Sequence, residues 1–201
     1  MARWEALIFD FDGVIADTEP YHWQSWVDLL SPRGFDLNWD DYCRECRGVA
    51  ESRMLQALER LTPAAREWTD LPQHYPERKR RVLERVTSAP PIASETVAML
   101  HGLVGYRVGL VTSALEEHVA PVLRHTGIYD CFHALVFANE VQNHKPAPDP
   151  YLLAAKKLGV TSGLAFEDSP FGIESARAAG LDVVRVDDPA RLAEVVRQSL
   201  A

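Results

Sequence analysis

Two pairs of carboxylates stand directly after short apolar runs of this sequence. Asp10 and Asp12 follow the first run, and Glu167 and Asp168 follow a much later one. Two like charges about 4 Å apart repel by ~4 kcal/mol at the effective dielectric near a protein surface, so carboxylates brought together need a cation among them. Oxygen ligands of this kind suit Mg2+. The two pairs therefore predict a magnesium site if the fold brings the two runs to one edge.

Other polar residues extend this pattern to phosphoryl transfer. Thr112 and Ser113 follow a third apolar run, and Lys145 follows a fourth. An ammonium group and a divalent cation can neutralise a phosphate dianion, while a carboxylate attacks phosphorus to form an aspartyl-phosphate. Thr112 or Ser113 can hydrogen-bond the phosphoryl oxygens. Asp12, across a turn that Gly13 allows, can exchange a proton with the leaving and the attacking oxygen.

Each of these features also has a purely structural explanation when it is taken alone. An Asp-x-Asp loop is often a solvated turn, a Thr-Ser pair after a strand is often a cap, and Glu-Asp-Ser is typical of a helix start. All of them occur here in chain order, each after a predicted strand. Their joint occurrence favours the catalytic interpretation.

The apolar runs predict the strands that position these side chains. They cover residues 4–9, 106–111, 134–137, 164–166 and 183–186. Helical patterns separate the later runs, and Ser169 has the type and place of an N-cap. Strands that alternate with helices in this way form a parallel sheet with helices on both faces. Ligands bind such sheets outside the carboxyl ends of the strands, where all the candidate residues fall.

The first and second strands are separated by far more chain than one crossover needs. That segment carries apolar stripes at helical spacing over 20–30, 54–61 and 82–86. We therefore expect an α/β fold in which a Rossmann-like parallel-sheet core of residues 1–14 and 90–201 carries an inserted helical domain of residues 15–89.

Composition limits the partners. A net charge of −8 disfavours nucleic acid, whose phosphates are held by excess Lys and Arg. Neither a signal peptide nor a membrane span is expected. Three cysteines are too few and too uneven for a disulfide framework, and Cys43 and Cys46 are interpreted as half-buried helix positions. We expect a cytoplasmic monomer or small homo-oligomer that acts on a small phosphorylated metabolite and binds neither nucleic acid nor membrane.

Four segments resemble the motifs of the haloacid dehalogenase superfamily, in the branch of β-phosphoglucomutase and phosphoglycolate phosphatase that has a helical cap after the first motif. The segments are Asp10-Phe11-Asp12-Gly13-Val14 with Asp17-Thr18-Glu19-Pro20, Val111-Thr112-Ser113-Ala114, His144-Lys145-Pro146-Ala147-Pro148-Asp149, and Phe166-Glu167-Asp168-Ser169 with Gly172-Ile173. The resemblance covers nearly the whole chain. It implies a Mg2+-dependent enzyme with a mobile cap whose closing excludes water.

The resemblance also implies individual roles. Asp10 is the expected nucleophile and Asp12 the expected acid and base. Mg2+ is expected to be held by Asp10, the backbone carbonyl of Asp12 and Asp168, with Glu167 in or near the metal shell. Gly13 and Ala114 are placed beside the substrate. In the inserted domain, the candidate substrate contacts are His22, Arg47, Glu51 and Arg53.

Three functions compete at this point. The first is a phosphatase, in which water attacks the aspartyl-phosphate, and the second is a mutase similar to β-phosphoglucomutase, in which a sugar hydroxyl attacks instead. The third is a catalytically idle binding or regulatory module. In the mutase pattern an Arg stands three residues after the Gly of Gly-Val, and Glu51 occupies that position here. A negative charge there opposes a second phosphate, so we predict net hydrolysis of a small phosphate monoester such as a sugar phosphate.

Overall fold

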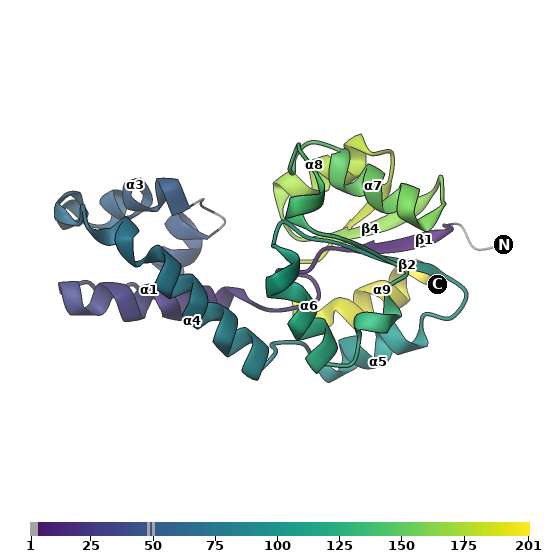
Figure 1. Ribbon diagram of the computed structural model, residues 1–201, viewed down its shortest axis with the longest axis horizontal. Coiled ribbons are helices and arrows are strands. Elements are labelled where there is room, and N and C mark those ends of the chain that lie inside the picture. Colours follow the sequence, from purple (N-terminus) through teal and green to yellow (C-terminus); the bar gives the residue numbers. More distant parts are fainter. Residues whose placement is uncertain (1–3, 48, 50) are drawn as a thin grey trace. The chain divides into compact units, whose positions relative to one another are not determined.

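The computed structural model describes residues 4–47, 49 and 51–201, and for Glu51 and Ser52 it describes the backbone alone. The chain divides into two compact units (Figure 1). The core unit consists of Met1–Asp17 and Pro90–Ala201, and the inserted unit consists of Thr18–Ala89. At the junction, within the core unit, the Asp17 N–H donates to the carbonyl oxygen of Pro91 at 2.9 Å.

The core unit is built on a five-stranded sheet in the order β3-β2-β1-β4-β5, and all pairs are parallel. The strands are β1 (Ala6–Phe9), β2 (Arg107–Val111), β3 (Ala134–Val136), β4 (Gly163–Glu167) and β5 (Asp182–Arg185). All four residues of β1 are fully buried, as an apolar run at the centre of a covered sheet requires. The Phe9 ring stacks on Phe166 of β4, with 4.8 Å between ring centroids. The predicted parallel sheet is confirmed.

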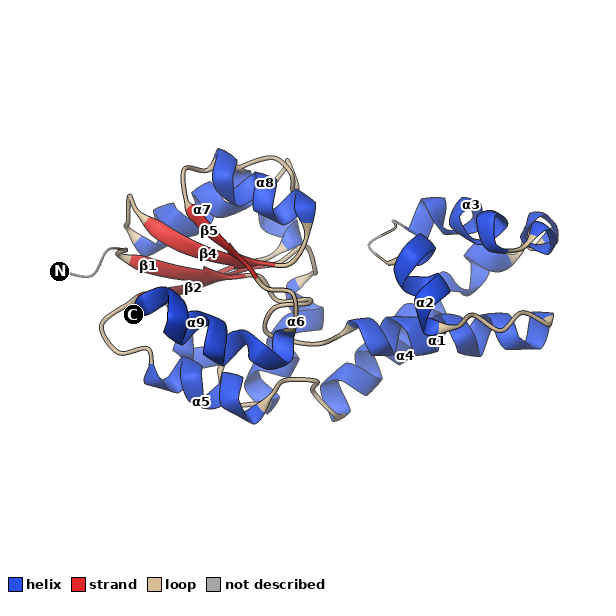
Figure 2. Ribbon diagram, turned by 180° about the vertical axis from the view of Figure 1, so that it is seen from behind, coloured by secondary structure: helices blue, strands red, loops and turns tan. Residues whose placement is uncertain are grey.

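Helices cover both faces of this sheet (Figure 2). They are α5 (Ser94–Gly102), α6 (Glu116–His125), α7 (Asp149–Leu158), α8 (Pro170–Ala178) and α9 (Leu192–Leu200). Figures 1 and 2 show α7 and α8 on one face and α5, α6 and α9 on the other. Ser169 is the N-cap of α8, as expected, and its hydroxyl accepts a hydrogen bond from the N–H of Gly172. The predicted layers of helices on both faces are therefore confirmed.

The inserted unit is helical and has its own core. Its helices are α1 (Glu19–Leu30), α2 (Trp39–Asp41), α3 (Glu51–Leu61) and α4 (Tyr75–Ser88), with a π-helical turn at Tyr42–Cys46. Aromatic side chains pack this core, and the Trp26 and Tyr75 rings meet edge to face at 5.4 Å. Cys43 is half-buried in the π-helical turn, whereas Cys46 is fully buried and burial raises its pKa to about 11. Cys46 is thus part of this core, which is deeper than the half-buried position expected for it.

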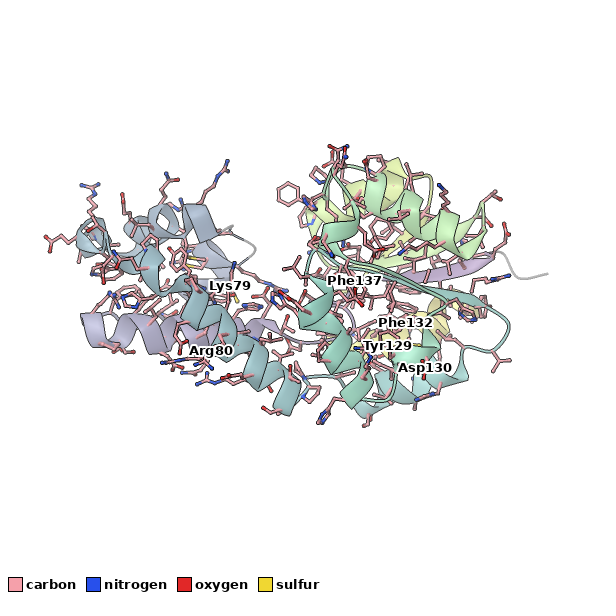
Figure 3. The ribbon with its side chains drawn as sticks, in the orientation of Figure 1. Lys79, Arg80, Tyr129, Asp130, Phe132 and Phe137 are labelled. Atoms are coloured by element: carbon pink, nitrogen blue, oxygen red, sulfur yellow. The ribbon has the colours of Figure 1, made fainter. Side chains whose placement is uncertain are left out.

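Figure 3 shows side chains of both units: Lys79 and Arg80 lie on α4, and Tyr129, Asp130, Phe132 and Phe137 lie on the segments that flank β3. Within the described part of the chain, no helix is both long enough and apolar enough to span a bilayer.

Candidate active site

Three carboxylates converge at the carboxyl edge of the sheet. Asp10 directly follows β1, Glu167 is the last residue of β4 and Asp168 follows it, and the two strands are paired neighbours. Each of these residues offers a carboxylate oxygen within 4.8 Å of the others. Asp10 and Glu167 are buried and Asp168 is partly so, so water screens their repulsion poorly. The pairing of β1 with β4 thus creates a concentrated negative charge.

Lys145 lies between two of these carboxylates. Its Nζ donates to Asp10 Oδ1 at 2.6 Å and to Glu167 Oε1 at 2.5 Å, and it is 3.4 Å from the carbonyl oxygen of Val111. Burial acts to lower the pKa of Lys145, but Asp10 and Glu167 outweigh it and raise that pKa to about 12. Burial also raises the pKa of the Asp10 carboxyl well above its ordinary value, although Lys145 opposes the rise. Lys145 is thus a fixed cation.

Glu167 is surrounded by groups from α7 and from the start of α8. The carboxylate is fully buried, and Oε1 accepts a second hydrogen bond, from the Tyr151 hydroxyl at 2.7 Å. The Ser169 hydroxyl donates to Oε2 at 3.2 Å. A Cβ atom on Gly172 would stand 1.9 Å from Oε1, so only glycine lets the first turn of α8 pack against this carboxylate.

The loop after β1 is shaped for a close approach to Asp168. Gly13 has a φ of +76°, in the left-handed region that favours glycine, and a Cβ atom there would stand 2.4 Å from Asp168 Oδ2. The N–H of Gly13 donates to the carbonyl oxygen of Ala16 at 2.9 Å, and Asp12 forms a parallel bridge with Ala16. Asp12 is half-buried and lies outside the group of three converging carboxylates.

The segment after β2 separates its two hydroxyls. Thr112 is buried, and its Oγ1 accepts a hydrogen bond from the N–H of Ala114 at 3.0 Å. Ser113 is exposed. The Thr112 hydroxyl thus forms a turn-stabilising bond of the kind that competes with a role on substrate, although its proton can still be donated elsewhere. The Ala114 carbonyl accepts a bond from Ala138 N–H, which fixes the segment against the chain after β3.

The loop that carries Lys145 is tied down at both ends. The Ser175 hydroxyl of α8 is fully buried and donates to the carbonyl oxygen of Ala147 at 2.6 Å. The side-chain amide of Asn143 donates to Asp149 Oδ1 at 2.9 Å. Because both bonds restrain the loop, the ammonium group of Lys145 is held in position beside Asp10 and Glu167.

The inserted unit places its candidate residues among charged and aromatic neighbours. His22 is half-buried on α1, and Arg53 is exposed on α3. The exposed Arg47 has its Nε 3.9 Å from Glu19 Oε1, and the Tyr42 hydroxyl donates to Glu19 Oε2 at 2.6 Å. The predicted contact through Glu51 falls on a side chain outside the described residues.

Sequence reasoning missed a buried cation in the same unit. Arg78 of α4 is only 7% exposed, stacks on the Trp26 ring at 4.2 Å and donates to the Ser25 hydroxyl. It lies in a helix stretch crowded with exposed basic residues, so its type gave no signal. Burial is what separates Arg78 from its neighbours, and only the fold reveals it.

The donor set fits a divalent cation. Asp10, Glu167 and Asp168 bring three negative charges to one small volume, while the Lys145 ammonium group pairs with Asp10 and Glu167 and adds one positive charge. All the donors are oxygen atoms, which are the ligands that Mg2+ takes. A cation at this point would relieve the remaining repulsion.

Comparison with known proteins agrees with the fold. Residues 7–186 match the family model described as haloacid dehalogenase-like hydrolase. The chain therefore belongs to the haloacid dehalogenase-like hydrolases. The predicted membership is confirmed.

Individual relatives and a solved structure are similar over most of the chain. Fructose-1-phosphate phosphatase YqaB of Escherichia coli is 38% identical over 188 residues, which cover 92% of this chain and 97% of the relative. The β-phosphoglucomutase of Bacillus subtilis is 29% identical, over 90% of this chain and 83% of the relative. The crystal structure of a hydrolase from Streptococcus pneumoniae superimposes with a TM-score of 0.73 at 25% identity, over 97% of this chain and 99% of that one.

Proposed function

We propose that this hydrolase is a Mg2+-dependent phosphatase that removes phosphate from a small sugar phosphate through an aspartyl-phosphate on Asp10. One observation carries the proposal: Asp10, Glu167 and Asp168 converge within 4.8 Å, with the Lys145 ammonium bonded to Asp10. This arrangement pairs a carboxylate nucleophile with groups that neutralise a phosphate dianion. Phosphoryl transfer requires a nucleophile and positive charges that lie close together around the phosphate.

Asp10, Glu167 and Asp168, together with the backbone carbonyl of Asp12, are the groups that would hold Mg2+. When bound, the ion supplies positive charge that offsets the charge of the phosphoryl oxygens. Lys145 adds a second positive charge through a group that stays protonated at neutral pH, since its pKa is raised to about 12. The hydroxyls of Thr112 and Ser113 supply further donors to the phosphoryl oxygens.

In the first half-reaction, a carboxylate oxygen of Asp10 attacks phosphorus, and the bond between phosphorus and the sugar oxygen breaks. Asp12 donates its proton to that leaving oxygen, so the sugar departs as a neutral alcohol. The position of Asp12, two residues after the nucleophile and across the Gly13 turn, supports this role.

In the second half-reaction, Asp12 takes a proton from a water molecule whose oxygen attacks phosphorus. The bond between phosphorus and the Asp10 oxygen breaks, which releases inorganic phosphate and restores the Asp10 carboxylate. The same residue therefore serves first as acid and then as base.

The similarity to a fructose-1-phosphate phosphatase supports a sugar phosphate as substrate. We propose that the inserted unit is the cap and that its polar side chains recognise the sugar. Among them, the Glu19 carboxylate lies beside the Tyr42 hydroxyl and the Arg47 guanidinium group. His22, Glu51 and Arg53 complete the proposed substrate contacts on this unit.

The similarity to a β-phosphoglucomutase makes a mutase the second candidate. A mutase must hold a second phosphate while the first is transferred, and bidentate Arg is the suitable group. Glu51 stands in the position of that Arg, and Arg47 already has the Glu19 carboxylate 3.9 Å from its Nε. These charges favour hydrolysis.

A metabolite screen separates the two functions. The full chain is incubated with Mg2+ and fructose 1-phosphate, other sugar monophosphates, or β-glucose 1-phosphate with a trace of the 1,6-bisphosphate. We expect release of inorganic phosphate that stops in excess EDTA, and little glucose 6-phosphate. Efficient formation of glucose 6-phosphate without phosphate release would reverse the choice, and full activity in EDTA would overturn the metal requirement.

A further inference from the structure

Tyr151 is a fully buried aromatic residue whose hydroxyl reaches the catalytic edge. It belongs to α7, and its ring lies with Ala154 and Leu158 in the apolar cluster that packs against the sheet. Its hydroxyl donates to Glu167 Oε1 at 2.7 Å. A tyrosine hydroxyl carries its proton at neutral pH, so it acts as the donor of this bond.

The bond from Tyr151 falls on the oxygen that Glu167 shares with Lys145. Lys145 Nζ is 2.5 Å from the same Oε1, and its other contacts are Asp10 Oδ1 and the Val111 carbonyl oxygen. Three acceptors match the three protons of an ammonium group. Lys145 therefore has no further donor with which to hold Glu167, and the Tyr151 hydroxyl is the second strong donor to Oε1.

The Glu167 carboxylate is out of contact with bulk water. The carboxylate has no exposed surface, and the place where a Cβ of Gly172 would stand is only 1.9 Å from Oε1. Oε2 is held by longer bonds, of 3.2 Å from the Ser169 hydroxyl and 3.4 Å from its N–H. A donor lost from Oε1 cannot be replaced by bulk water, so the carboxylate would have to turn.

From these contacts we propose that Tyr151 is a positioning residue: its hydroxyl fixes the orientation of the Glu167 carboxylate and so organises the oxygen ligands of the cation site. The inference rests on the proposed metal site of the phosphatase. The ring of Tyr151 packs the core, while the hydroxyl adds a separate function to the same side chain. Loss of a hydrogen-bond partner behind a metal ligand typically weakens metal affinity or activity by roughly 10- to 100-fold.

Tyr151→Phe isolates the hydroxyl because it keeps the ring and its packing. Mg2+ binding is measured by titration calorimetry on the full chain without substrate. We expect the Kd for Mg2+ to rise roughly tenfold, and the Mg2+ concentration that gives half-maximal hydrolysis of p-nitrophenyl phosphate to rise by a similar factor. KM for p-nitrophenyl phosphate at saturating Mg2+ should stay within about twofold, because Tyr151 is fully buried and its hydroxyl is bonded to Glu167.

Tyr129→Phe is the matched control. Tyr129 lies in the segment before β3, at the amino end of that strand, whereas the candidate active site lies at the carboxyl ends of the strands. Its ring packs against the Arg124 guanidinium group at 4.4 Å, and a Phe ring keeps this contact. This variant should bind Mg2+ as the unmodified chain does. An unchanged Mg2+ affinity in Tyr151→Phe would overturn the inference, whether or not the melting temperature falls, because the hydroxyl would then serve packing alone.

A double-mutant cycle tests whether Tyr151 acts through Glu167. In a Glu167→Gln background, Tyr151→Phe should weaken Mg2+ binding by less than about threefold, since the oriented carboxylate is already gone. A full tenfold loss in both backgrounds would show that the hydroxyl acts elsewhere and would overturn the inference. Hydrolysis by the unmodified chain tests the proposed function, whereas these affinity ratios are measured on substrate-free protein, so the two failures are distinguishable.

Discussion

One group of charged side chains in the core unit and one in the inserted unit are paired in opposite ways. In the core unit, Lys145 joins Asp10 and Glu167, partners that are 135 and 22 residues away along the chain, and the side chains involved are at most 9% exposed. In the inserted unit, α4 carries ion pairs between residues three or four apart, such as Glu77 with Arg80 and Arg81, and these are about half exposed.

This difference separates ion pairs that form only in the folded sheet from ion pairs that form within a single helix. Exposed pairs along one helix form from local sequence alone, are screened by water and salt, and contribute little to stability. Buried pairs between distant strand ends exist only when the sheet has formed, and an unpaired member is costly. A buried ion pair is therefore the better indicator of a functional site.

Removal of the nucleophile should have the largest effect. Asp10→Asn has the shape of the natural side chain but no nucleophilic oxygen, so turnover of the best sugar phosphate should fall to background while circular dichroism shows an intact fold. Asp130→Asn removes the same charge from an exposed position of the core unit and should leave turnover unchanged. More than a trace of activity in Asp10→Asn would contradict the assigned nucleophile.

Removal of the shared cation comes next. Lys145→Gln leaves Asp10 and Glu167 buried without their ammonium partner, which should destabilise the metal-free chain by about 3–5 kcal/mol and abolish most activity. Mg2+ should recover part of the stability, because it replaces the lost positive charge. Denaturant unfolding with and without Mg2+ measures both effects, and Lys156→Gln on the exposed face of α7 is the control.

Gly172→Ala should lower stability by a smaller but measurable amount, although helix propensity alone predicts that alanine stabilises. Alanine normally stabilises a helix by about 0.5–1 kcal/mol relative to glycine. Here the added methyl group would overlap the Glu167 carboxylate, so the variant should melt lower and bind Mg2+ more weakly. Gly102→Ala, at the end of α5 with open space around it, should not lower the melting temperature. Equal behaviour of the two variants would refute this account of Gly172.

Loss of an exposed pair should have the smallest effect. Arg80→Gln removes the partner of Glu77 and Glu84 on α4, and the melting temperature should change within experimental error at physiological salt. A thermal scan at low and high salt checks this. A large, salt-independent loss of stability would contradict the contrast between the two units.

The convergence of side chains at the carboxyl edge of the sheet could be predicted from the sequence, because the strand ends of a parallel sheet meet at one edge. Residues such as Asp10, Lys145 and Asp168 needed only the order of the strands to be brought together. Helix α5 was not predicted, since it does not follow the regular apolar spacing of an amphipathic helix. Cys43 and Cys46 were expected in a helix, but nothing in their spacing predicted that this helix is π-helical. The contact of the Tyr151 hydroxyl with Glu167 could not be predicted, because apolar periodicity describes the ring and not the hydroxyl. The burial of Arg78 could not be predicted either, because apolar periodicity does not show which charged side chain of a helix is buried.

The hydrogen bond between Asp17 and Pro91 means that the chain leaves the core unit and returns to it at neighbouring points. An insertion between such points adds little closure entropy to the sheet, whatever its length, since the cost rises only with the logarithm of the loop. The core unit can thus accept inserts of different size and sequence at this place without a change in strand order. The inserted unit can therefore diversify in evolution separately from the core unit, and grafting a foreign insert between Asp17 and Pro91 is the corresponding route for engineering.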